Sequence, residues 1–315
     1  MGKVKICLSV AAMDDAFRRM ESELGGLADV SVCGLDDYDL RGVDIYIGKK
    51  LQAEKLKAAD KLRAVFAYKT GVDDFPLGEL SARGITVCNS HANSEYIAEY
   101  AFALATALPA RVVESDRRMR GGDWSKSDPY WRSVFSMTVG LVGYGHIGKA
   151  VHDIMKRNGI KCVTLDRGKK YDGIATVKTL EELCGACDML VLSLPKTSDT
   201  DRMFDARIFS LLKGKYIVNV GRGNCIDEPA LYEALSGGVL AGAAIDTWRE
   251  KTKGGEKLLP FDKPFDSLDN IILSPHKAMQ IADGHEKYII DVIDNVKRYL
   301  AGERPRNIVD CGGGY

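Results

Sequence analysis

The segment TVGLVGYGHIGKAVHDIMKR limits the fold of this chain more than any other part of the sequence. Thr138 to Val142 is an apolar, β-rich run, whereas residues 149–157 place apolar side chains at helical spacing. Between these two runs stand three glycines, Gly143, Gly145 and Gly148. The order of strand, glycine turn and helix predicts a βαβ unit of a parallel sheet.

A downstream acid makes this turn a candidate dinucleotide site. The apolar run 160–165 ends in Asp166, 23 residues after Gly143, which is about where a ribose-binding carboxylate follows such a loop. Gly143 allows the tight turn, Gly145 lets backbone N–H groups approach a pyrophosphate, and Gly148 lets the helix pack closely on the strand. The helix N-terminus adds partial positive charge. We therefore predict that this loop binds a dinucleotide.

The remaining apolar runs predict an α/β chain with two domains. A length of 315 residues is long for one core and suits two. Short apolar runs alternate with helical patterns on both sides of a long helical pattern that begins near Ser94, and those after the glycine loop are almost wholly apolar, as in strands covered on both faces. The expected strands are 4–10, 43–47, 63–67, 85–88, 138–142, 160–165, 189–194, 216–220, 241–245 and 271–273.

Charge balance and the N-terminal residues exclude several classes of protein. Lys plus Arg and Asp plus Glu number 44 each, so no overall field recruits nucleic acid or an anionic membrane surface. The start MGKVKICLSV lacks the long apolar stretch of a secretory signal. We expect a cytoplasmic protein with no nucleic-acid or membrane partner.

The eight cysteines give one spaced pair, Cys184 and Cys187. A CxxC pair serves both metal binding and redox chemistry, but no second pair or histidine pair completes a metal site. Several other cysteines lie inside apolar runs, where thiols behave as small hydrophobic groups. We expect reduced thiols, a structural role for the CxxC pair and no bound metal.

Residues that carry chemistry are expected at the carboxyl ends of the strands, where doubly wound sheets bind ligands. Strand 216–220 leads into Gly221-Arg222-Gly223, strand 241–245 into Asp246, and strand 271–273 into Ser274-Pro275-His276. An Arg between glycines is expected to be sterically open, and its fork suits a carboxylate or a carbonyl. A His at a strand end can exchange a proton near neutral pH. The alternatives are a structural ion pair for the Arg and a packing role for the His.

Over nearly its full length the chain resembles the D-isomer-specific 2-hydroxyacid dehydrogenases. The resemblance is carried by motifs in the family's order, namely Lys69-Thr70-Gly71-Val72-Asp73, Asn93-Ser94 with Ala98-Glu99, the GYGHIG loop, Asp166, Asn219-Val220-Gly221-Arg222-Gly223, Ala244-Ile245-Asp246, Ser274-Pro275-His276 and Asn307-Ile308-Val309-Asp310. It implies two doubly wound parallel-sheet domains, with a Rossmann NAD-binding domain (95–279) inserted in a flavodoxin-like substrate domain (1–94 plus 280–315).

The reaction implied by the resemblance is hydride transfer between a nicotinamide and C2 of a D-2-hydroxy acid or 2-oxo acid. His276 is expected as acid and base, and Arg222 as the anchor of the substrate. The backbone of the loop Lys69, Thr70, Gly71 and Val72 is expected to hold the carboxylate. The expected cofactor-binding residues are Gly143, Tyr144, Gly145, His146, Ile147, Gly148, Asp166, Arg167, Pro195, Val220 and Asp246.

Two departures from the family pattern leave alternatives open. The family's Glu that raises the pKa of the His normally stands five residues after Asp246, where this chain has Lys251. Glu250 and Glu256 are the candidates to replace it, and we favour Glu256. Lys69 stands where the family often has a small residue. Its ammonium group either adds positive charge for an anionic group of the substrate or is simply solvated.

The cofactor and the assembly follow from the same resemblance. Asp166 favours NAD because an acid there repels a 2′-phosphate, while Arg167 softens this preference and keeps NADP as the alternative. Trp124, Tyr130 and Trp131 belong to a region that forms an arm around a second subunit in the family, so we expect a homodimer. The competing hypothesis is a dinucleotide-sensing interaction protein that resembles a corepressor and has residual or no dehydrogenase activity.

Overall fold

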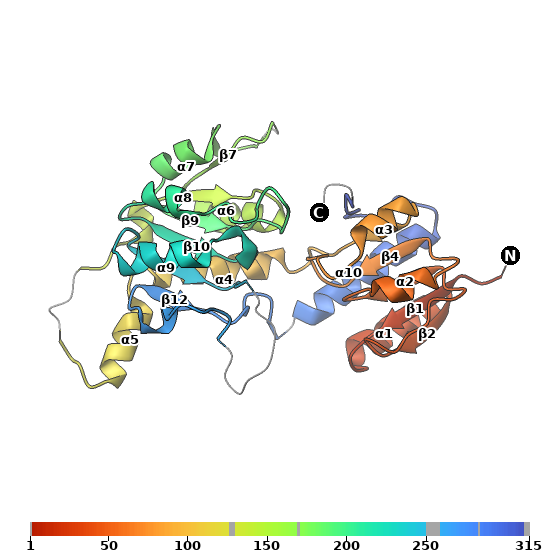
Figure 1. Cartoon of the computed structure of the whole chain (residues 1–315). Helices are drawn as coiled ribbons and strands as arrows, with labels where there is room; N and C mark the ends of the chain where they lie inside the picture. The colour runs from red at the N-terminus through yellow and green to blue at the C-terminus, as the bar shows by residue number, and fades with distance from the viewer. Residues whose placement is uncertain (1, 126–129, 169–170, 250–258, 283, 312–315) are drawn as a thin grey trace. The chain divides into compact units, whose positions relative to one another are not determined.

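The computed structural model describes residues 2–125, 130–168, 171–249, 259–282 and 284–311. The chain divides into two compact units, residues 1–93 with 281–315 and residues 94–280. Most of their helices and several of their strands are labelled in Figure 1. No helix among the described residues is long and apolar enough to cross a bilayer.

In the first unit, the described residues form a five-stranded parallel sheet in the order β2-β1-β3-β4-β5. This is the flavodoxin-like order expected from the resemblance. Helices α1 and α10 pack on one face, and α2 and α3 pack on the other. The elements are β1 (Lys5–Ser9), α1 (Asp15–Gly25), β2 (Asp29–Cys33), β3 (Ile45–Gly48), α2 (Ala53–Lys57), β4 (Ala64–Ala67), α3 (Leu77–Ala82), β5 (Thr86–Cys88) and α10 (Gly284–Leu300).

The described part of the second unit forms a seven-stranded parallel sheet in the order β12-β11-β10-β9-β6-β7-β8. The first strand of this unit, β6, lies inside the sheet, and the chain winds to either side of it, which is the Rossmann arrangement. The elements are α4 (Ser94–Ala107), α5 (Val112–Arg120), η1 (Val134–Ser136), β6 (Thr138–Val142), α6 (His146–Arg157), β7 (Lys161–Leu165), β8 (Ala175–Val177), α7 (Leu180–Ala186), β9 (Met189–Leu192), α8 (Ala206–Ser210), β10 (Tyr216–Asn219), η2 (Gly223–Cys225), α9 (Glu228–Ser236), β11 (Gly242–Ile245), η3 (Phe265–Ser267) and β12 (Ile271–Leu273).

Alternating strand residues of this sheet serve two separate cores. Val142, Leu192 and Ile217 face α7, α8 and α9, whereas Leu141 and Val191 face α4 and α6. Helices therefore cover both faces, which explains the nearly continuous apolar runs of its central strands. In both units, the loops that follow the parallel strands are available for binding and chemistry. The expected α/β class with two parallel-sheet domains is confirmed.

Two strands lack a clear signal in the sequence. Strand β2 is an edge strand whose residues are exposed or half-buried, and β8 is a three-residue edge strand. An edge strand needs fewer apolar residues because a neighbour covers only one of its sides.

Candidate active site

The glycine loop joins β6 to α6, and each glycine has its own structural reason. Gly143 has a φ of +94°, and a Cβ there would lie 2.9 Å from the carbonyl oxygen of Ser193. A Cβ on Gly148 would lie 2.0 Å from the carbonyl oxygen of Gly143. Gly145 differs, because no heavy atom lies within 4 Å of the place where its Cβ would be. The loop is thus closed toward the protein and open at Gly145, just before the first turn of α6.

This shape fits a dinucleotide pyrophosphate. The first N–H groups of a helix have no partner inside the helix and attract anions. Because strand β7 is paired with β6, the loop after β7 lies next to the glycine loop. Asp166 is exposed in that loop, and its Oδ1 accepts a hydrogen bond of 2.8 Å from the Gly168 N–H. Arg167 beside it is exposed as well.

The other loop residues are arranged differently. The Tyr144 hydroxyl lies 2.6 Å from Nδ1 of His152, which is buried on α6, and the Tyr144 ring packs edge-on against Tyr171. Burial lowers the pKa of His152, so the neutral imidazole is favoured. His146 is exposed and Ile147 half-buried. Tyr144 therefore has a packing role in addition to any contact with a cofactor.

Arg222 follows β10 in a turn that is shaped by Asn219. The buried Asn219 side chain accepts a 3.0 Å hydrogen bond from the Gly221 N–H and donates a 3.2 Å bond to the Arg222 carbonyl oxygen. The Arg222 guanidinium donates a 3.1 Å bond to the carbonyl oxygen of Gly221, and the residue is half-buried. This turn fixes the backbone from which the Arg222 side chain projects.

Backbone atoms of neighbouring loops lie close to the two glycines that flank Arg222. A Cβ on Gly221 would lie 2.6 Å from the Leu194 N, and a Cβ on Gly223 would lie 2.0 Å from the Trp248 carbonyl carbon. Neighbouring backbone occupies the space on both sides, so these glycines are required for close packing of the loops after β9, β10 and β11. The interpretation of the glycines as open space around Arg222 is wrong.

His276 lies beyond the end of β12 and has an unusual backbone conformation. Its φ is +55°, which is uncommon for a residue with a side chain, and the residue is exposed. The His276 N–H donates a 2.8 Å bond to the backbone carbonyl oxygen of Asp246. The Asp246 carboxylate is fully buried and accepts bonds from the Ser274 hydroxyl, from the Lys277 N–H at 2.7 Å and from the Ala278 N–H at 3.2 Å. Asp246 therefore holds the loop on both sides of His276, and we call this set of bonds the Asp246 clamp.

Two further side chains support the clamp through Ser274. The Tyr100 hydroxyl on α4 lies 2.9 Å from the Ser274 hydroxyl. The Trp248 indole N–H donates a 3.1 Å bond to the Ser274 carbonyl oxygen. Neither residue was singled out from the sequence, because each contact joins segments that are far apart in the chain.

The sheet order brings these loops to one edge. The loops after β6, β9, β10, β11 and β12 contain the glycines, Pro195, Arg222, Asp246 and His276 in turn, and all strands are parallel. Val220 is buried at the end of β10, and Pro195 is half-buried. Because only β11 separates β10 from β12, the strands that carry Arg222 and His276 are about 10 Å apart.

In the first unit, residues 69–72 form a loop after β4, at the carboxyl edge of its sheet. The carbonyl oxygens of Lys69 and Thr70 accept bonds from the Ser90 N–H and the Asn89 side chain. The N–H groups of Thr70, Gly71 and Val72 donate to no other described residue. The Lys69 ammonium forms an ion pair with Asp74.

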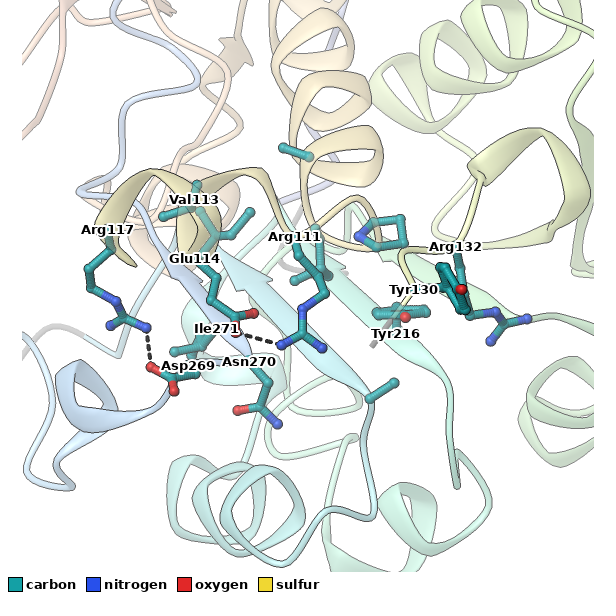
Figure 2. A pocket seen from close by; sticks show the side chains of 15 residues that line it. Arg111, Val113, Glu114, Arg117, Tyr130, Arg132, Tyr216, Asp269, Asn270 and Ile271 are labelled. Atoms are coloured by element: carbon teal, nitrogen blue, oxygen red, sulfur yellow. Dashed lines mark hydrogen bonds and ion pairs between the residues drawn. The ribbon is translucent and has the colours of Figure 1, made fainter. Parts of the chain in front are cut away.

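The remaining predictions concern the catalytic carboxylate, the CxxC pair and a metal site. Glu256 and its alternative Glu250, with Lys251, lie outside the described residues. Cys184 and Cys187 are buried in the core, and no cluster of three potential metal ligands occurs in the described ranges. A pocket of about 280 Å³ lies at the opposite edge of the second sheet, where Tyr216 begins β10 and Ile271 begins β12 (Figure 2). This pocket is separate from the loops that carry Arg222 and His276.

Comparison with known proteins places these loops in a family. Residues 102–278 match the model described as the NAD binding domain of D-isomer specific 2-hydroxyacid dehydrogenases. The chain is 33% identical to a glyoxylate reductase of Korarchaeum cryptofilum over 82% of this chain and 80% of the relative. It is 28% identical to a D-3-phosphoglycerate dehydrogenase of Methanocaldococcus jannaschii over 98% of this chain and 59% of the relative.

A solved structure shows a similar fold. It is the NADPH-dependent glyoxylate/hydroxypyruvate reductase of Sinorhizobium meliloti in complex with NADP and malonate, with a TM-score of 0.80, 25% identity and coverage of 99% of this chain and 98% of that chain. These relatives are oxidoreductases, so a dinucleotide-sensing interaction protein finds no support among them. The chain belongs to the D-isomer specific 2-hydroxyacid dehydrogenase family, and its second unit contains the NAD-binding domain of that family.

Proposed function

We propose that this protein reduces a small 2-oxo acid to the D-2-hydroxy acid, and catalyses the reverse reaction, with NAD as the cofactor and NADP as the alternative. One observation carries the proposal: a guanidinium and an imidazole follow β10 and β12 at the sheet edge that also carries the glycine loop. The glyoxylate reductases among the relatives support a substrate of this size.

Arg222 and His276 divide the work on the substrate. The Arg222 guanidinium binds the carboxylate and polarises the C2 carbonyl. In reduction, protonated His276 donates its proton to the carbonyl oxygen, and in oxidation the neutral imidazole takes the proton of the hydroxyl. The nicotinamide, when bound, supplies or accepts the hydride at C2. One group thus sets opposite pH limits for the two directions.

The cofactor would lie along the edge from β7 to β10. Gly143, Gly145 and Gly148 with the backbone of residues 144, 146 and 147 would hold the pyrophosphate, and Asp166 and Arg167 would contact the adenosine ribose. Pro195 and Val220 line the path toward the nicotinamide. The exposed Asp166 carboxylate favours a ribose 2′-hydroxyl over a 2′-phosphate.

Asp246 has a positioning role in this proposal. Both of its carboxylate oxygens accept hydrogen bonds inside the clamp and its side chain is fully buried. The full burial leaves no surface of the carboxylate open for a direct contact with the cofactor. The geometry therefore favours Asp246 as the residue that fixes His276.

The loop 69–72 would bind the substrate carboxylate through its backbone N–H groups, which suit an anion. Lys69 would add positive charge for an anionic group. The pKa of Lys49 is lowered by partial burial and then by the nearby charge of Lys69, which indicates that two ammonium groups lie close together at this edge. Asp74 offsets part of that charge through its ion pair with Lys69.

We propose Glu256 as the carboxylate partner of the His276 imidazolium, with Glu250 as the alternative. The two assignments differ in kinetics. Glu256→Gln should lower turnover and move the basic limb of the reduction profile to lower pH, because an imidazolium without a carboxylate partner loses its proton more easily. If Glu250→Gln alone gives this result, the assignment passes to Glu250.

The catalytic proposal is tested by a screen and two substitutions. Purified protein is assayed with both cofactors against glyoxylate, pyruvate, hydroxypyruvate and bulkier 2-oxo acids. On an accepted acid, His276→Ala should lower kcat about 10²- to 10⁴-fold, and Arg222→Lys should raise KM and lower kcat together because the bidentate fork is lost. Arg207→Gln, which removes an exposed ion pair with Glu181, is the matched control and should keep wild-type kinetics. Undiminished reduction by His276→Ala refutes the role of that residue.

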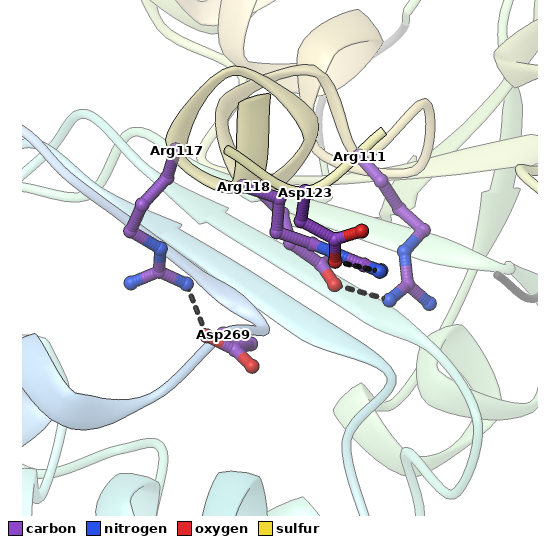
Figure 3. A network of polar contacts seen from close by, with 6 residues as sticks. Arg111, Arg117, Arg118, Asp123 and Asp269 are labelled. Atoms are coloured by element: carbon purple, nitrogen blue, oxygen red, sulfur yellow. Dashed lines mark hydrogen bonds and ion pairs between the residues drawn. The ribbon is translucent and has the colours of Figure 1, made fainter. Parts of the chain in front are cut away.

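We also propose a homodimer that is formed through Trp124, Tyr130 and Trp131 and the described residues beside them. Large exposed apolar side chains gather there, with Trp124 73%, Tyr130 99% and Trp131 61% exposed. Helix α5 is fixed by ion pairs, including Arg117 with Asp269 and Arg118 with Asp123 (Figure 3). Exposed aromatic side chains of this kind are typical of subunit contacts. Sedimentation should give a dimer for the wild type and a monomer for Trp131→Glu; a monomeric wild type refutes the proposal.

A further inference from the structure

Two cysteines that are far apart in the sequence meet in the first unit. Cys7 lies in β1, and Cys33 is the last residue of β2. In the parallel register Cys7 lies opposite Ser31, and Cys33 lies opposite Ser9. The two Sγ atoms are 2.8 Å apart, and both cysteines contribute to the same core cluster. A disulfide bond is about 2.05 Å long, so the two sulfurs have to approach by less than about 1 Å. The two-residue offset in register puts the Cα atoms about 7–8 Å apart, so the ends of the two strands must also shift toward each other as the bond forms.

The two thiols differ in accessibility and in acidity. Cys7 is 1% exposed, whereas Cys33 is half-buried at the end of an edge strand. The hydrogen bond between the two thiols lowers the pKa of Cys33, while burial and the carboxylate of Asp37 act in the opposite direction. The same hydrogen bond and burial raise the pKa of Cys7. Cys33 is therefore the better nucleophile, and Cys7 is placed to react with it next.

The CxxC pair, in contrast, has no accessible and no acidic thiol. Cys184 and Cys187 are both buried, and burial raises their pKa values to about 11 and about 12. Neither thiol has the exposure or the thiolate character that oxidation by a solute requires. The pair that stands out in the sequence is thus the less reactive pair in the structure.

We propose that Cys7 and Cys33 form a peroxide-reactive dithiol that oxidises to a disulfide between β1 and β2. The Cys33 thiolate attacks one oxygen of a hydroperoxide, the O–O bond breaks, and Cys33 becomes a sulfenic acid while the other oxygen leaves as water or alcohol after taking up a proton. The Cys7 thiol then loses its proton and attacks the Cys33 sulfur, so that the S–S bond forms, the S–O bond breaks and water leaves. In total two thiols lose two electrons and two protons, and the hydroperoxide is reduced. A dithiol reductant reverses the modification.

The proposal is tested on the full chain by mass spectrometry. Reduced protein is treated with hydrogen peroxide at increasing molar ratio, free thiols are blocked with N-ethylmaleimide, and the digest is searched for linked peptides. We expect the Cys7–Cys33 linkage to form first and to disappear after dithiothreitol. Cys7→Ser should leave a Cys33 sulfenic acid that dimedone traps, and Cys33→Ser should leave Cys7 unmodified.

The matched control is Cys184→Ser, which should keep the Cys7–Cys33 linkage unchanged. Linkage of another pair first, or reduced Cys7 and Cys33 in wild-type protein after the other cysteines have been oxidised, overturns the proposal. The wild-type measurement holds even if a variant fails to fold. Because no readout depends on dehydrogenase activity, the result is independent of the proposed function.

Discussion

Asp246→Asn tests the clamp with little change in volume. The carboxylate accepts hydrogen bonds from Ser274, Lys277 and Ala278. An Asn side chain can keep Oδ1 for the first two, but its NH₂ group would face the Ala278 N–H, which donates as well. One buried donor without an acceptor costs about 1–3 kcal/mol. We therefore expect a folded protein whose second unit is destabilised by about that amount.

Asp246→Asn should lower kcat more than it lowers the affinity for the dinucleotide. The lost bond lies two residues after His276, whose φ of +55° depends on support from the surrounding loop. A displacement of about 1 Å at a reacting group costs about 10²-fold in rate. We expect kcat to fall about 10²-fold, with the Kd for the dinucleotide within about threefold of wild type. Stopped-flow turnover and a fluorescence titration with NADH measure the two quantities.

A second Asp→Asn substitution is the control for this test. Asp205→Asn also replaces a carboxylate that accepts a backbone N–H bond, at the start of α8, and it should leave kcat unchanged because Asn is an equally good N-cap. If Asp246→Asn weakens dinucleotide binding strongly and leaves single-turnover hydride transfer intact, Asp246 contacts the cofactor and the positioning role is refuted.

Four other substitutions test the dinucleotide-binding unit. Gly145→Ala should keep the melting temperature and lose dinucleotide affinity, whereas Gly148→Ala should lower the melting temperature because its Cβ meets the Gly143 carbonyl oxygen; calorimetry and NADH titration distinguish the two. The pKa of His152 is lower in the folded protein than in the unfolded chain, so the unfolded chain binds more protons and the stability should fall as the pH drops below about 6.5. His152→Gln should reduce this loss of stability between pH 7.5 and pH 5.5, as measured by thermal melts. An equal loss in the wild type and the variant would contradict this prediction. Asp166→Ser should shift the ratio of kcat/KM toward NADP, and an unchanged ratio would remove Asp166 from cofactor selection.

Much of the second unit could be predicted because its signals are local. The glycine loop, its strand and its helix lie within one segment of the chain, and the order Gly143, Gly145, Gly148 states the steric requirement of each position. The strand ends that carry Arg222 and His276 could be predicted in the same way, since apolar runs with a polar residue at the end are visible without tertiary structure.

The supporting contacts could not be predicted because they depend on strand register. Asp246 reaches Ser274 across 28 positions, and Tyr100 reaches it across 174. Gly221 and Gly223 were expected to open space around an arginine, but their real constraint is the backbone of adjacent loops.

The cysteines show the same limit. The sequence draws attention to the CxxC pair, while the sulfurs in contact belong to Cys7 and Cys33, which are separated by 26 positions and brought together by the pairing of β1 with β2. Only the register of these strands reveals the pair.

The most direct measurement of the central claim follows the hydride itself. Protein is incubated with an accepted 2-oxo acid and NADH that carries deuterium at both positions of C4, and the product acid is analysed by mass spectrometry and chiral chromatography. The account predicts one deuterium at C2 of a D-configured 2-hydroxy acid. Cofactor oxidation without label in the acid, or an L-configured product, would contradict it.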